Sequence, residues 1–234
     1  MSISERPPVP NKGEMISPFA WANVLHDRIK SADQLRRLPE EKIVQATRDY
    51  LNACVEYFAN KVCDDYLQEV GKTAEHAINQ RSVLVLPTKD LKETLRKFGV
   101  SSKTLKNTDR KDPFIIFHKR KSESTNDYYT VLFIITPELI IRAKEKPIEA
   151  LATMLHYFSN IRDFVNGRLD KDTDDIFELR AKATQAHFLK EVIRQYPDID
   201  LGSSYSEVLS EYPDGIDSLP EGVVYWDRLH GYRV

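Results

Sequence analysis

Apolar residues recur at helical spacing over a long stretch of the chain, from Pro39 to Gly71. They stand three, four or seven residues apart, at Val44, Leu51, Val55, Phe58, Val62 and Tyr66. Further apolar residues widen this stripe beyond that of a simple surface helix. Two acidic residues at the start suit the positive end of a helix dipole, and glycine is a common helix stop. The pattern therefore predicts one long helix, ended by Gly71, at the centre of the core.

The composition is that of an ordinary globular protein. The 234 residues are 41% hydrophobic and 30% charged, with a formal net charge of -2, which argues against wholesale disorder. The longest apolar run, Val131 to Ile135, is far shorter than the roughly 20 residues that span a membrane, and the chain starts without an apolar leader. Cys54 and Cys63 would lie on opposite faces of one helix, too far apart for a disulfide. These features predict a cytoplasmic protein with free thiols and no membrane partner.

The pattern changes after residue 80. Three short apolar or aromatic runs are typical of strands: Val83–Leu86, Phe114–Phe117 and Tyr128–Ile135. The last two runs flank a polar loop, which indicates a hairpin, and helical patterns follow over residues 147–166 and 174–196. We expect an α+β fold with a long central helix, a small three-stranded, largely antiparallel sheet with a hairpin, and two C-terminal helices packed on that sheet.

The domain organisation is simple. Residues 1–15 are rich in proline and almost without apolar residues, and they are predicted to be a flexible tail. No linker-like composition divides the rest. Residues 16–234 are therefore expected to form a single domain, with a loop-rich C-terminal segment from about 197 to 234.

The helix predicted over 147–166 is apolar around most of its circumference, as a buried helix would be. Its polar residues form one narrow ridge at spacings of four and three, made of Glu149, Thr153, His156, Asn160 and Asp163. Such a ridge either faces water or lines a cleft. In the second case it is a binding site.

The order of elements resembles that of the minimal zincin metallopeptidase domain. There a small sheet leads into a buried helix, and a further helix carries an acid. In the gluzincin branch the buried helix carries His-Glu-x-x-His, with two zinc ligands and a general base, and a glutamate on the next helix completes the site. Over about residues 40–195, this chain places His156-Tyr157-Phe158-Ser159-Asn160 at that motif and Glu178 at a similar spacing downstream. The resemblance implies that His156, Asn160, Asp163 and Glu178 line a relict cleft.

Two positions depart from the gluzincin motif. Tyr157 replaces the general base, and Asn160, a poor zinc ligand, replaces the second histidine. The chain also has no nucleophile elbow, no phosphate-binding glycine loop and no Cys-x-x-Cys. We therefore expect no catalytic residue, no metal ligand set and no cofactor, and a pseudoenzyme rather than an enzyme. A metal-dependent hydrolase with a non-standard site stays open as a second alternative.

The charge is unevenly distributed along the chain. Residues 89–121 carry 11 basic and 4 acidic residues, a net charge of +7, whereas residues 170–227 carry a net charge of -9. A basic segment of this kind is able to follow a phosphate backbone, so a nucleic-acid-associated protein is the first alternative function. If the basic segment binds no partner, it either pairs with the acidic region within the fold, or the two regions are separate faces exposed to water. A negatively charged protein partner is equally open for this segment, and Lys119, Arg120 and Lys121 are its candidate binding residues.

The C-terminal end is aromatic, with Tyr225 and Trp226 after Val223-Val224. It either packs back onto the core or anchors a partner, as exposed Tyr and Trp do at interfaces. Together these features predict a non-catalytic cytoplasmic binding or regulatory protein. It would act through protein–protein contacts on a degenerate zincin-like scaffold.

Overall fold

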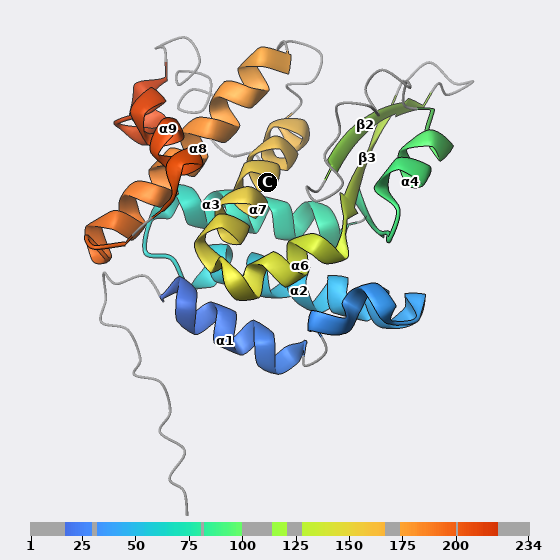
Figure 1. Ribbon diagram of the computed structural model, residues 1–234. Helices are drawn as coiled ribbons and strands as arrows, with labels where there is room; N and C mark the ends of the chain where they lie inside the picture. The colour runs from blue at the N-terminus through green and yellow to red at the C-terminus, as the bar shows by residue number, and fades with distance from the viewer. Residues whose placement is uncertain are drawn as a thin grey trace, which may run out of the picture.

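The computed structural model describes residues 17–29, 32–80, 82–99, 114–120, 128–166, 174–199 and 201–219 (Figure 1). These residues form eight α-helices, two short 3-10 helices and one small sheet. Helix α7 (Pro147–Val165) lies in the middle of the molecule, with α8 (Asp174–Gln195) and α9 (Ser203–Glu211) on one side and the sheet on the other. The chain is therefore mostly helical.

The N-terminal part contains three helices and a 3-10 turn. Helix α1 (Pro18–Arg28) starts where the Ser17 hydroxyl accepts a hydrogen bond from the backbone N–H of Phe19, with a proline at the first helical position. The turn η1 (Ala32–Arg37) leads to α2 (Glu40–Asn60), and α3 (Asp65–Asn79) follows after four residues. The side chain of Asp64 caps α3 by accepting a hydrogen bond from the N–H of Leu67 at 2.8 Å.

The prediction of one long helix ending at Gly71 is wrong, because α2 and α3 are separate helices that pack against each other. The apolar spacing hides the break, since Val62 in the connection is itself buried. Gly71 lies within α3, where a Cβ would stand 2.6 Å from the backbone nitrogen of Ala59. This glycine permits close contact between two helices and ends neither.

The sheet has the strand order β1-β3-β2. Strand β1 (Val83–Pro87) pairs in parallel with the central strand β3 (Tyr128–Ile135), with Val83 opposite Val131. Strand β2 (Phe114–Arg120) lies antiparallel on the other edge of β3. Helix α4 (Leu91–Lys97) follows β1 and covers the outer face of the sheet through Leu91 and Leu95, which pack on Ile134.

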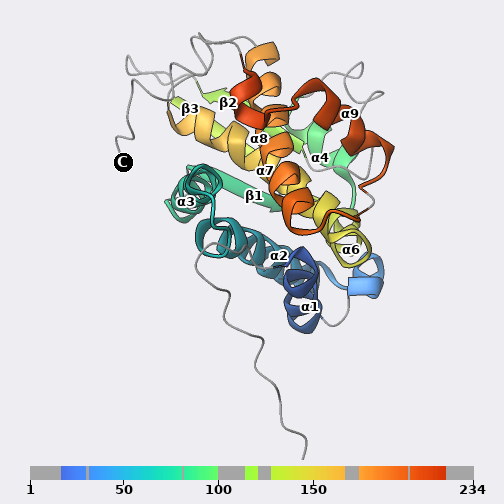
Figure 2. The same cartoon turned by 90° about the vertical axis from the view of Figure 1, so that its left-hand side faces the viewer.

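The predicted fold class is therefore wrong. The described chain is mostly helical rather than α+β, and its sheet is mixed, with one parallel and one antiparallel pair, rather than largely antiparallel. The two C-terminal helices pack mainly on other helices rather than on the sheet, although Tyr157 of α7 contacts Phe133 of β3. Helix α7 contacts mainly α3, α6 (Pro137–Glu145), α8 and α1, while α8 contacts α7, α9 and the turn η2 (Gly215–Ser218). In Figure 2, α1 and α2 lie on one side of α7, and α8 lies on the opposite side.

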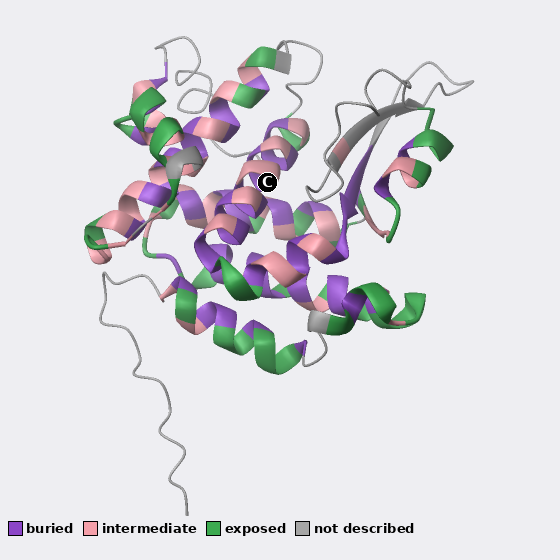
Figure 3. Cartoon of the chain, in the orientation of Figure 1, coloured by how far each residue is buried: buried purple, intermediate pink, exposed green. Residues whose placement is uncertain are grey.

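The core lies around α7, whose apolar side chains are almost all buried (Figure 3). Aromatic rings from three helices meet there edge to face, with Phe58 of α2 contacting Phe158 of α7 and Phe188 of α8. None of the described helices is both long and apolar enough to span a membrane. The division into a tail over residues 1–15 and a single domain over 16–234 stays a prediction.

Candidate functional site

A polar cleft opens between α7 and α8, with a volume of about 610 Å³. Its walls come from four helices and from the segment that precedes α9. The lining residues are Arg142, Lys146, Glu149, Thr153, His156, Tyr157, Glu178, Gln185, Leu201, Gly202 and Tyr205. We call this the α7–α8 cleft. Three members of the ridge on α7 lie in it, so at this end the ridge lines a cleft rather than an open face.

His156 and Glu178 face each other across this cleft. Nε2 of His156 lies 3.4 Å from Oε2 of Glu178. The side chain of the histidine is mostly buried, whereas that of the glutamate is 52% exposed. The contact with His156 lowers the pKa of the Glu178 carboxyl, and partial burial opposes that effect. The histidine carries its charge only when protonated, so this is a pH-dependent ion pair.

The other polar groups of the α7–α8 cleft are also held by neighbours. Nζ of Lys146 lies 2.7 Å from a carboxylate oxygen of Glu149. The hydroxyl of Tyr205 donates a hydrogen bond to the backbone carbonyl of Glu149. The amide nitrogen of Gln185 donates to the carbonyl oxygen of Ala152. These bonds fix the positions of the side chains and connect α9 and α8 to α7.

The inner end of the ridge has a different environment. Asp163 is fully buried, and its carboxylate lies 3.2 Å from Nη1 of Arg180, which is also buried. A second buried arginine, Arg162, lies 3.8 Å from the same carboxylate and stacks over the ring of Tyr66. Asn160 is half-buried, and its side-chain oxygen has no hydrogen-bond partner among the described residues. Asp163 and Asn160 therefore do not line the cleft with His156 and Glu178.

The chemistry of the cleft differs from that of a zinc peptidase. Tyr157, at the position of the general base, packs its ring on Phe133 of the central strand with a centroid separation of 5.4 Å. Within the part of the chain that the structure describes, no three His, Cys, Asp or Glu side chains are grouped so that they could hold a metal ion. What the cleft offers is a set of paired charges and hydrogen-bonding groups open to solvent.

Several predicted site residues fall where the structure gives no side-chain detail. Lys119 and Arg120 lie at the end of β2 with undescribed side chains, and Lys121, Tyr225 and Trp226 lie outside the described residues. The structure adds residues that sequence patterns did not indicate, among them Arg142 and Lys146 at the end of α6. The helix start Thr136-Pro137-Glu138 is the sequence signal that indicates α6, and therefore the position of these two cations. Leu201 and Tyr205 have no such signal.

Comparisons with known proteins return no match, whether against family models, curated proteins or solved structures.

Proposed function

We propose that this chain is a non-catalytic binding protein of the cytoplasm that recognises another protein through the α7–α8 cleft, on a scaffold similar to a degenerate zincin. One observation carries the proposal. Four charged side chains of the cleft pair with each other, in the His156–Glu178 and Lys146–Glu149 contacts, while the cleft stays open to solvent.

Paired charges suit recognition better than chemistry. A nucleophile or general base needs a group whose reactive atom is directed at a substrate, and a zinc site needs three protein ligands. Here Nε2 of His156 faces a carboxylate, but the described lining of the cleft holds no serine or cysteine nucleophile for this histidine to activate. The residue between the two ligand positions of the zincin motif is Tyr157. Partner groups exchange hydrogen bonds with such a surface without leaving a buried charge unpaired.

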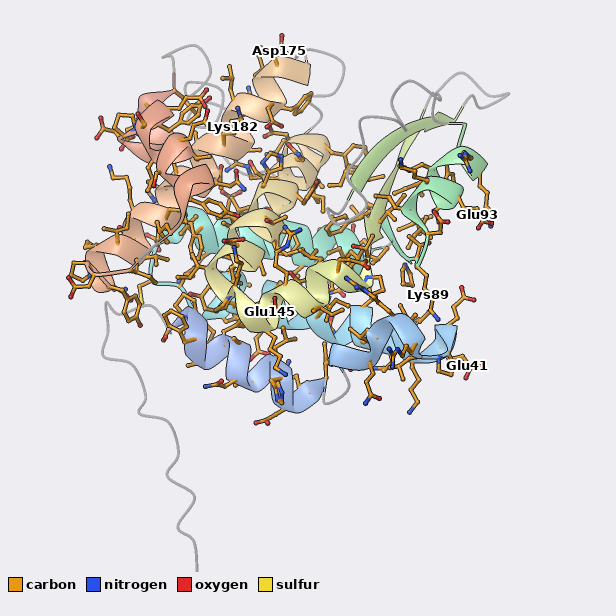
Figure 4. All side chains as sticks on the ribbon, in the orientation of Figure 1. Glu41, Lys89, Glu93, Glu145, Asp175 and Lys182 are labelled. Atoms are coloured by element: carbon orange, nitrogen blue, oxygen red, sulfur yellow. The ribbon has the colours of Figure 1, made fainter. Side chains whose placement is uncertain are left out.

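The test uses two charge reversals on the same helix. Glu178→Lys reverses a charge in the cleft. Asp175→Lys makes the same charge reversal one turn earlier on α8, at an exposed residue that does not line the cleft (Figure 4). Tagged wild-type chain and both variants are used to capture partners from the native host, with circular dichroism as the control for folding. We expect a partner that is retained by the wild type and Asp175→Lys and lost with Glu178→Lys.

Two results would contradict the proposal. A partner captured equally by all three proteins would place the contact elsewhere on the surface. Stoichiometric zinc in the purified wild type, lost in His156→Ala, would favour a metal-dependent hydrolase instead.

A further inference from the structure

A second, less polar hollow adjoins the α7–α8 cleft. This hollow has a volume of about 290 Å³ and lies between α1 and the segment that joins α8 to α9. The two share a wall of five residues: Lys146, Glu149, Leu201, Gly202 and Tyr205. We call the second space the α1 hollow, and the two together the groove. The groove runs from His156 at one end to Phe19 at the other.

The α1 hollow is lined mainly by apolar side chains, those of Phe19, Pro147, Ile148, Ile199, Leu201 and Tyr205. Phe19 is 47% exposed and meets the ring of Tyr196 edge to face. A large aromatic side chain that is half in solvent at the rim of an apolar hollow is a typical anchor point for a partner's side chain. This end of the groove therefore suits one bulky apolar residue.

A carboxylate stands beside this apolar end. Glu145, the last residue of α6, lines the hollow and is exposed (Figure 4). Among the described residues no ion pair joins Glu145 to a cation, and its neighbour Lys146 pairs with Glu149. The described lining of the whole groove contains three carboxylates, of Glu145, Glu149 and Glu178, against two cations, Arg142 and Lys146. The described lining therefore holds one more carboxylate than cations, and Glu145 is the carboxylate for which the described residues show no ion pair.

Gly202 lines both hollows where they adjoin. It has a φ of 74°, and a Cβ added to it would meet none of the described atoms within 4 Å. A peptide backbone is therefore able to pass this point without a side chain in its way.

We propose that the groove binds an extended peptide segment of the partner, which places a bulky apolar side chain in the α1 hollow and a lysine or arginine against Glu145. The proposal rests on the function proposed above and specifies the chemistry of the partner. The polar end, with its internally paired charges, contacts the rest of the segment through neutral hydrogen bonds.

The probe is a displayed library of random dodecapeptides, selected on the full chain. We expect enrichment of peptides that carry Leu, Met or Phe within one or two positions of Lys or Arg. Binding of a selected peptide should weaken about tenfold in Glu145→Lys and in Leu201→Asp. It should change less than about twofold in the controls Glu41→Lys and Val24→Asp, which alter exposed residues outside the groove. Replacing the basic residue of the peptide by glutamate should restore binding to Glu145→Lys, which a variant that fails to fold cannot do.

Several results would overturn the proposal. Selected peptides without a basic residue, or peptides that bind Glu145→Lys as well as the wild type, would remove the assigned contact. A synthetic peptide of residues 1–16 that displaces the selected peptides would assign the groove to the chain itself. A dimer that the peptides dissociate would assign it to a second copy. If partner capture still depends on Glu178 while the library fails, only this inference is wrong, whereas loss of both results removes the proposed function as well.

Discussion

The close contact between α2 and α3 at Gly71 predicts that Gly71→Ala lowers the free energy of unfolding, whereas in an open helix the same substitution would raise it. Gly71→Ala adds one methyl group in the interior of α3. In an open helix this substitution would stabilise the protein by about 1 kcal/mol, because alanine has the higher helix propensity. Here the new Cβ would lie 2.6 Å from the nitrogen of Ala59 and 2.7 Å from the carbonyl carbon of Phe58, both backbone atoms that cannot rotate away.

The two helices must therefore separate to admit the methyl group. Overpacking of this kind costs about 1–3 kcal/mol, and contact with backbone atoms places it at the upper end of that range. After the gain in propensity is subtracted, we expect a net loss of about 1–2 kcal/mol in the free energy of unfolding. For a chain of this size that loss lowers the Tm by about 2–8 °C.

Thermal unfolding followed by circular dichroism measures this change. Lys72→Ala is the matched control, since Lys72 is the next residue on α3 and is exposed. It should leave the Tm within about 2 °C of the wild type. A rise in Tm for Gly71→Ala would refute the close contact and return Gly71 to an ordinary helix position.

Three further predictions concern titratable and buried groups. Glu178→Gln removes a carboxyl whose pKa is lowered by the contact with its histidine partner, so the wild type's advantage in urea unfolding should be present above the ordinary pKa of 4.5 and disappear as the pH falls below it; an advantage that persists in acid would contradict the pairing. Asp163→Ala leaves the buried guanidinium of Arg180 without this carboxylate and should lower the free energy of unfolding by about 3–5 kcal/mol in the same assay, whereas a loss below ~1 kcal/mol would show that the pair is solvated. Burial raises the pKa of the Cys54 thiol far above its usual range, while Cys63 is exposed. A thiol reagent should therefore modify Cys63 in the native protein and Cys54 only after unfolding. Two fast-reacting thiols would be inconsistent with the fold.

Local patterns in the sequence predicted most of the individual elements. Helix α7 and helix α8 begin and end within a residue or two of the expected positions, because apolar spacing, a proline start and a glycine or proline stop are all local signals. The break between α2 and α3 was not predicted, because Val62 continues the apolar spacing through the connection between the two helices. The signal that reveals the break is Asp64, which caps the new helix.

Features that depend on distant contacts were not predictable in this way. The parallel pairing of β1 with β3 is set by how the segments between them pack, and no spacing within either strand indicates its direction. The candidate site shows the same division. The regular spacing of polar residues in the sequence predicted the ridge on α7, and the structure brings His156 of this ridge close to Glu178. It also buries Asp163 against Arg180, which the period alone could not distinguish from a position in the cleft.

Carboxyl footprinting tests the central claim, that a protein partner binds at the α7–α8 cleft, most directly. A carbodiimide and an amine label the exposed carboxylates of the chain with and without the captured partner, and mass spectrometry measures the labelling of each residue. The account predicts that the partner protects Glu178 while Asp175 and Glu41 react as in the free chain, since all three carboxylates are exposed and only Glu178 lies in the cleft. Equal labelling of Glu178 in the free and bound chain would contradict it.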